Sequence, residues 1–207
     1  MQKRFITPAD KFQYFFGYYD LQPYDETNEK HLVHRVKFLD REPTAEDIAE
    51  LGYVKDGTFF KISETTSWNF QQGSMMQWYE SGKSVIFDGK GYVSRVVGID
   101  GKEIDGYDCP FATINFKSGK AVSVNFSRIY DFRRGYGYCN IPDPFANVNA
   151  PDDDGIFLVD LRTKEKKLLA SYSVMKKAFE EKPFTDKKLV VNHITFNPSG
   201  TKCVFLL

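Results

Sequence analysis

A repeated strand–turn–strand pattern is the feature of this sequence that most limits its fold. Four segments each contain a short apolar run, a tight turn with small or polar residues and a lysine, and a second apolar run: residues 21–36, 76–88, 114–126 and 194–207. Three turns contain Gly82, Gly119 or Gly200, and glycine tolerates the positive φ that hairpin loops need. The interval between Gly82 and Gly119 matches the period of roughly 40 residues of a four-stranded propeller blade.

Composition also favours strands. Aromatic residues make up 16% of the chain, and aromatic side chains suit the pleated, half-buried surface of a sheet. The wider intervals between the repeated segments contain two predicted helices, at 43–51 and at 173–181. In the first of these, Thr44 is the expected cap, and Asp47 follows three residues later as in a capping box.

These elements together predict an all-β, β-propeller-like fold of about three and a half four-stranded antiparallel blades, with two short inserted helices. A loop rich in Gly, Pro, Asn and Asp at 128–155 precedes a further strand pair at 156–171. The inner strands of successive blades are expected near residues 74–79, 111–116 and 192–196. We therefore expect a single domain, residues 1–207, that is an incomplete propeller.

The final repeated segment has a consequence for assembly. Its apolar strand ends the chain with half a blade unmade, and an unfinished blade exposes a strand edge and apolar surface. We therefore expect a homodimer, or association with a missing C-terminal half.

Charge and cysteine content exclude several classes of protein. The 28 Lys and Arg residues balance 28 Asp and Glu residues, so no net field draws the chain to nucleic acid or to an anionic membrane. No apolar stretch has the length of a signal peptide core or a membrane span. The three cysteines fit neither a disulfide framework nor a zinc site, which predicts a reducing, cytoplasmic location.

Several longer motifs resemble those of one protein family. The sequence is similar to a poorly characterised bacterial β-propeller family, found among glycan-biosynthesis genes and sometimes labelled glycosyltransferase-like, at residues 15–20, 34–52, 65–78, 123–138 and 192–200. The family's fold is similar to that of oligogalacturonate lyase and of TolB-type propellers. The resemblance implies that this chain is roughly the N-terminal half of a family member.

The resemblance also implies a function. It favours a glycan-related propeller that binds an acidic oligosaccharide or sugar acid at the mouth of its axial channel, or processes it in the complete form. Whether the protein is an enzyme stays open between a metal-dependent, lyase-like protein and a glycosyltransferase-associated one, and the isolated chain is expected to be inactive. The alternative is a non-catalytic scaffold for protein–protein interaction, because propellers host both classes.

The segment 67–73 contains the first group of candidate ligand-binding residues. Its aromatic and amide side chains suit sugar rings and hydroxyls at a channel mouth: Trp68, Asn69, Gln71 and Gln72. Loop amides also serve to cap backbone groups, which is the alternative role.

His193 is the candidate metal ligand. In the lyases that the fold resembles, histidines and a glutamine at inner-strand positions hold a divalent metal, and imidazole and amide oxygen suit a metal such as manganese. A lone histidine is also a common hydrogen-bonded structural residue. His31 and His34 are three positions apart on one predicted strand, so they face opposite sides and cannot both join His193.

Arginines and tyrosines complete the candidates: Arg35, Arg41, Arg128, Arg133, Arg134, Tyr136 and Tyr138. Arg128 leads into the long loop, where a guanidinium can bind a carboxylate or phosphate through two parallel hydrogen bonds, or can tie down its own loop. Because Gln72, Arg128 and His193 lie at ends of the repeated hairpins, we expect them to converge at one mouth of the axis.

Overall fold

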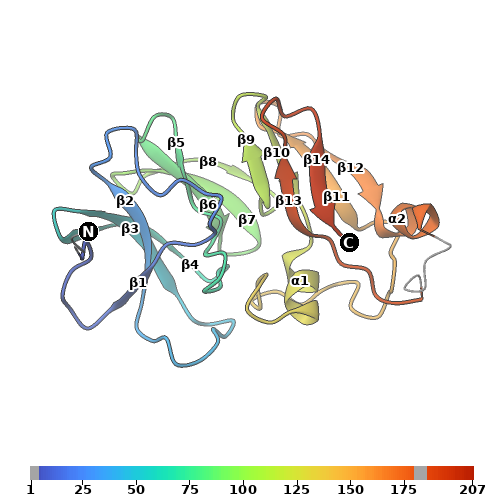
Figure 1. Cartoon of the computed structure of the whole chain (residues 1–207), viewed down its shortest axis with the longest axis horizontal. Helices are drawn as coiled ribbons and strands as arrows, with labels where there is room; N and C mark the ends of the chain where they lie inside the picture. The colour runs from blue at the N-terminus through green and yellow to red at the C-terminus, as the bar shows by residue number, and fades with distance from the viewer. Residues whose placement is uncertain (1–4, 180–185) are drawn as a thin grey trace, which may run out of the picture. The chain divides into compact units, whose positions relative to one another are not determined.

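The structure, a computed structural model, describes residues 5–179 and 186–207 (Figure 1). It is mostly strand, and it divides into two compact units, one that ends at Asp108 and one that begins at Cys109.

The first unit contains two four-stranded antiparallel sheets. The first sheet consists of β1 (Gln13–Phe15), β2 (His31–Val36), β3 (Ala49–Lys55) and β4 (Thr58–Thr65). The second consists of β5 (Gln77–Tyr79), β6 (Ser84–Gly89), β7 (Val93–Gly98) and β8 (Glu103–Tyr107). In both sheets the strands lie in chain order, so each sheet is a simple meander.

The second unit contains one further meander, a hairpin and two short helices. The four-stranded sheet consists of β9 (Thr113–Asn115), β10 (Lys120–Ser123), β11 (Gly155–Asp160) and β12 (Lys166–Ser171). The hairpin consists of β13 (Asn192–Phe196) and β14 (Cys203–Leu206), and the helices are α1 (Phe126–Phe132) and α2 (Tyr172–Ala178).

The predicted antiparallel strand pairs are therefore largely confirmed. Gly82, Gly119 and Gly200 have φ values of 79°, 65° and 66°, so the turns use the left-handed conformation for which the glycines were singled out. Three meanders and a hairpin are observed, and none of these sheets closes on itself.

The predicted helix at 43–51 is wrong. Thr44 and Asp47 do interact as a capping pair, since the Thr44 amide and hydroxyl donate to Asp47 Oδ2 at 2.8 and 2.9 Å. The chain then continues into β3, which pairs with β2 on one side and β4 on the other. Backbone hydrogen bonds to two neighbours outweigh the local preference of a short alanine- and glutamate-containing segment.

The first predicted hairpin also needs correction. Residues 21–30 form no strand, although Tyr24 makes an isolated antiparallel bridge to His31. The strand that pairs with β2 on this side is β1, which lies further towards the N-terminus. The carboxylate of Asp25 organises the turn, because its Oδ1 accepts from the amides of Glu29 and Lys30, both at 3.0 Å. A side chain that bonds its own backbone in this way favours a turn over a strand.

Of the two predicted inserted helices, only the one at 173–181 is confirmed. It is α2, capped by the Ser171 side chain, which accepts from the Val174 amide. Residues 180 and 181 of that prediction lie outside the described residues. The helix α1 was not predicted; it occupies the start of the predicted loop and is capped by Asn125.

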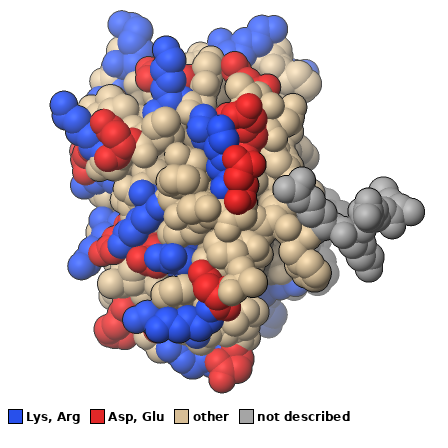
Figure 2. All heavy atoms as spheres, turned by 90° about the vertical axis from the view of Figure 1, so that its left-hand side faces the viewer, with Lys and Arg blue, Asp and Glu red and all other residues tan. Residues whose placement is uncertain are grey.

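Charged side chains are distributed evenly over the face shown in Figure 2, where acidic and basic residues are interspersed. None of the helices in the described ranges is long and apolar enough to cross a membrane.

Gly73 and His34 make a close contact that fixes the start of the second sheet. The His34 ring is buried and stacks on Phe15 with centroids 4.9 Å apart. Its Nε2 accepts a hydrogen bond from the Ser74 amide at 3.0 Å and lies 2.9 Å from the Ser74 hydroxyl. Gly73 has a φ of 63°, and a Cβ there would lie 2.5 Å from His34 Cε1. Glycine is therefore required at position 73 for both its backbone conformation and its small size.

We expect Gly73→Ala to lower the free energy of unfolding by about 2–4 kcal/mol, through left-handed strain and overpacking together. Gly91→Ala is the matched control, because Gly91 also has positive φ but has no atom within 4 Å of the added Cβ. That variant should lose only about 1 kcal/mol in urea unfolding. Equal losses in the two variants would show that the His34 contact is not tight.

Burial of His34 predicts acid sensitivity. Desolvation lowers the pKa of His34 to about 4, although the backbone carbonyls of Phe16 and Phe15 oppose the shift. As the pH falls below about 6.5, His34 therefore becomes protonated in the unfolded chain but stays neutral in the folded chain. Stability should be unaffected by this group above pH 6.5 and should fall by up to about 1.4 kcal/mol per pH unit as the pH drops towards 4.

The measurement is urea unfolding between pH 5 and 7, where carboxylates titrate little. His34→Gln keeps an acceptor near the Ser74 amide and should show a shallower pH dependence. Some slope should remain, because burial also lowers the pKa of His31. An unchanged slope in the variant would contradict the buried, neutral histidine.

Candidate functional site

The candidate site lies in the second unit, where the chain leaves α1. Gly135 and Gly137 have φ values of 93° and 70°, and these two left-handed residues turn the chain back over the helix. As a result Tyr138 is buried with its ring stacked on Phe126, 4.5 Å between centroids. Tyr136 is placed between two other side chains of the site.

Tyr136 links a cation and a histidine. The Arg133 guanidinium lies over the Tyr136 ring at 4.4 Å from its centroid, and the His193 ring meets the same ring edge-on at 5.8 Å. Both contacts are favourable for an aromatic ring, whose face attracts cations and whose edge packs well against other rings. The arrangement brings the C-terminal end of α1 and the start of β13 to one place.

A cavity of about 330 Å³ opens beside these residues. One part of its lining is apolar: Phe132, Leu189, Val190, Leu206 and Leu207. The other part is polar or basic: Arg133, Lys187, Lys188, Asn192 and His193. The volume falls at the lower end of the range for small-molecule sites.

His193 enters the cavity from an irregular strand. It has a φ of 49°, which is uncommon for a residue other than glycine, and its amide donates to the Asn192 side chain at 2.8 Å. The register of β13 against β14 shifts between Asn192 and Thr195. Irregularities of this kind redirect side chains and are frequent beside functional sites.

In the described part of the chain, the charged side chains that line the cavity are all positive. Among the residues that the structure describes, Arg133 forms no ion pair, whereas Lys187 pairs with Asp186 at 3.2 Å and Lys188 with Asp143 at 3.2 Å. No carboxylate side chain from the described ranges lines the cavity. An anionic group that entered it would meet Arg133 without having to displace a protein partner.

Arg128 supports the cavity from within the unit. Its side chain is 0% exposed, and Nε donates to the Leu189 carbonyl at 2.7 Å. Its remaining hydrogen bonds go to Asp143 and to backbone carbonyls of the loop: Phe145, Val148 and Asn149. The guanidinium therefore ties the loop and the cavity wall at Leu189 together, which favours the anchoring role over direct ligand binding.

Asp143 is the acidic partner of the Arg128 guanidinium. Burial alone would raise the pKa of Asp143, but hydrogen bonds from the Phe145 amide, Asn125 and Lys188 outweigh it and hold the pKa below its usual value. Asp143 thus stays ionised between Arg128 and Lys188, and a buried cation with an ionised partner is stable in its place.

The candidates from segment 67–73 all belong to the first unit, and most of their side chains are buried in its interior. Trp68, Asn69 and Gln72 are buried, and only Gln71 is exposed. Trp68 Nε1 donates to the Asp47 carbonyl at 2.8 Å. Asn69 Oδ1 accepts from the amides of Gln71 and Gln72 at 3.0 and 2.7 Å, which is the backbone-capping role considered as the alternative.

The sequence-based candidates thus fall into different parts of the chain. Arg128, Tyr138 and His193 belong to the second unit, and Gln72 belongs to the first. Their convergence at one channel mouth stays a prediction. Within the described ranges, no group of three or more His, Cys, Asp or Glu side chains is placed to hold a metal ion, so the manganese hypothesis gains no support from this geometry.

Sequence reasoning missed Lys187, Lys188 and Asn192 as cavity residues. The available signal was the pair of lysines directly before the apolar run that leads into β13, in "DKKLVVNHI". Basic residues beside an apolar run at the start of a strand are common, however, and their meaning depends on α1, which the sequence did not indicate.

Comparisons of the chain with protein-family models, curated proteins and solved structures find no match. The family resemblance of the motifs at 65–78 and 123–138 therefore stays a prediction. The function proposed below therefore depends on the chemistry of the residues that line the cavity beside His193.

Arg128→Lys tests whether the Arg128 guanidinium holds the loop and the cavity wall at Leu189 together. Lysine keeps the charge but cannot reproduce several directed hydrogen bonds, so we expect the free energy of unfolding to fall by about 3–5 kcal/mol. Arg162→Lys is the control, because Arg162 is exposed, and it should change stability by less than about 0.5 kcal/mol. Denaturant unfolding measures both, and a small loss in Arg128→Lys would refute the anchoring role.

Proposed function

We propose that the chain binds an acidic oligosaccharide at the cavity beside His193. The observation that carries the proposal is the lining of this cavity, in which the described residues include three cationic side chains and no carboxylate side chain. A guanidinium presents parallel N–H groups that match a carboxylate, so Arg133 is the residue expected to contact a sugar acid.

The rest of the lining suits the remainder of a sugar. The apolar residues provide a surface for the C–H face of a pyranose ring, and the Asn192 amide and the His193 ring provide hydrogen-bonding groups for its hydroxyls. Ligand sites commonly combine an apolar wall with a few placed polar groups in this way.

The proposed fold agrees with this function. We propose that the three meanders and the β13–β14 hairpin are blades of a partial propeller, and that the chain is related to the glycan-associated propeller family that its motifs resemble. Sequential antiparallel meanders are the units from which propellers are built, and the observed sheets have that form. Binding is the function proposed, and no residue is assigned a chemical step.

A protein-interaction scaffold is the second candidate, and one observation favours it. Among the described residues, β14 pairs only with β13, so its other edge has no strand partner. Val204 and Leu206 on β14 are 65% and 61% exposed. An unpaired edge with exposed apolar side chains is a surface to which a second copy of the chain could add a strand, which would form a homodimer.

The test of the saccharide proposal is calorimetric titration with trigalacturonate and with neutral galactotriose. We expect saturable binding of the acidic trisaccharide only, weakened by salt. Arg133→Gln should reduce the affinity about tenfold, because one charge-assisted contact is lost. Arg133 is exposed, so this substitution should leave the fold intact.

Arg162→Gln is the matched control, since it removes an exposed arginine elsewhere in the unit, and its affinity should equal that of the parent chain. Equal binding of the two saccharides, or an unchanged affinity in Arg133→Gln, would overturn the proposal. No binding together with a concentration-dependent dimer in light scattering would favour the scaffold.

A further inference from the structure

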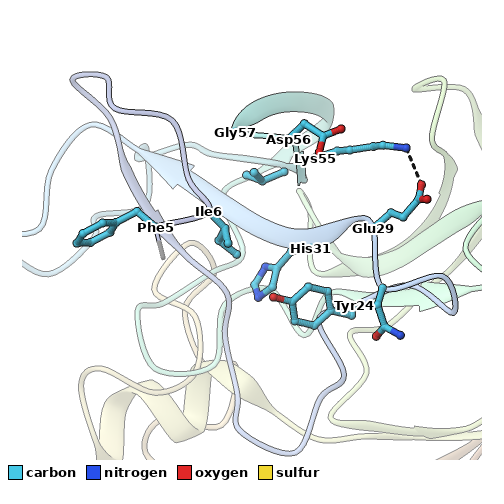
Figure 3. Close-up of a pocket in the computed structure, with 10 residues that line it drawn as sticks. Phe5, Ile6, Tyr24, Glu29, His31, Lys55, Asp56 and Gly57 are labelled. Carbon is cyan, nitrogen blue, oxygen red and sulfur yellow. Dashed lines mark hydrogen bonds and ion pairs between the residues drawn. The ribbon is translucent and has the colours of Figure 1, made fainter. Parts of the chain in front are cut away.

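A second cavity lies in the first unit and differs from the cavity beside His193 in volume and in charge. Its volume is about 610 Å³, and Figure 3 shows its walls: Phe5 and Ile6 on one side, Tyr24 and His31 below, Glu29 and Lys55 opposite, and Asp56 and Gly57 above. It is large enough for a small organic molecule. All of its residues belong to one unit, so its shape follows from the β1–β4 sheet and the loops next to that sheet.

Among the described residues of this cavity, one carboxylate forms no hydrogen bond or ion pair, although its charge adds to the effect of Glu29 in raising the pKa of Lys55. Lys55 Nζ lies 2.6 Å from Glu29 Oε2, so these two charges neutralise each other. The Asp56 side chain forms no hydrogen bond or ion pair with any residue in the described ranges. Burial lowers the pKa of His31, which keeps the imidazole uncharged near pH 7 and adds no positive charge to the wall. The described part of the lining therefore carries a net negative charge.

The turn that carries Asp56 holds it at the cavity. Lys55 and Thr58 pair across the β3–β4 hairpin, and the two residues between them, Asp56 and Gly57, have φ values of 50° and 74°. Two left-handed residues in a two-residue hairpin loop form a tight turn that favours Asp followed by Gly. The carboxylate is thus presented by a well-defined turn at the end of two paired strands.

Aromatic rings provide the rest of the recognition surface. Tyr24 packs perpendicular to His31 with centroids 4.6 Å apart, which fixes the orientation of the tyrosine ring. Phe5 also lines the cavity and is 94% exposed. The face of an aromatic ring attracts an organic cation, and an aromatic ring beside a carboxylate recognises an ammonium group by two independent interactions.

We propose that this cavity binds a small organic ammonium ion, in which the charged nitrogen faces Asp56 and an apolar or aromatic body packs against Tyr24. The site is separate in residues and opposite in charge from the cavity beside His193. The chain would therefore carry two ligand sites, one for an anion and one for a cation.

The experiment is titration of the full chain at pH 7 with phenethylamine, which is protonated at that pH, and with 2-phenylethanol, its neutral counterpart. We expect saturable binding of the amine and at least fivefold weaker binding of the alcohol. Asp56→Asn removes the charge and keeps a residue that tolerates positive φ, so the turn should persist, and the affinity for the amine should fall about tenfold.

Asp153→Asn is the matched control, because Asp153 is an exposed aspartate of the second unit, and it should leave the affinity unchanged. Tyr24→Leu should weaken binding of the amine while thermal unfolding confirms that the variant is folded. Absence of saturable amine binding, equal affinity for the alcohol, or an unaffected Asp56→Asn would each overturn the assignment. Because the two cavities share no residue, these results do not depend on the outcome with trigalacturonate.

Discussion

Each meander pairs its two central strands on both sides, and each outer strand has one edge without a strand partner among the described residues. This constraint determines where side chains have to contribute, because backbone polar groups outside the ladders still need partners. Polar side chains supply them at the loops of both units. Asp25 and Asn69 do so in the first unit, and Asn125 and Arg128 do so in the second.

The need to pair backbone polar groups explains why several polar side chains that would suit a ligand form hydrogen bonds within the protein instead. A buried amide or guanidinium that already has protein partners would have to give them up to bind a ligand, which costs the hydrogen bonds it loses. Residues whose polar atoms project into a cavity have no such penalty. Arg133 and Asp56 line cavities and form no ion pair with a described residue, whereas Arg128 and Asn69 are held by the chain around them.

Local patterns were enough to predict the strands and turns, and they failed where distant residues decide. The glycine turns and the helix α2 depend on neighbouring residues, so the sequence indicated them correctly. The segment 43–51 contains a real capping pair, but β2 and β4 decide that it continues as a strand. For the site, His193 lines the cavity, but its predicted role as a metal ligand stays a prediction, while Lys187 and Lys188 became visible only once α1 was placed. The predicted radial arrangement of blades stays a prediction, because it depends on contacts that no local pattern specifies.

The chain order of the sheets has a consequence for how this protein is made. The first two sheets are each complete within one continuous stretch, Gln13–Thr65 and Gln77–Tyr107, so each can form on the ribosome soon after its own residues emerge. The third sheet differs, because β10 must wait for β11 across the insertion that contains α1. Closing that longer loop costs more chain entropy before any hydrogen bond forms. The insertion that contains α1 and part of the basic cavity is therefore also expected to limit the rate at which the second unit folds.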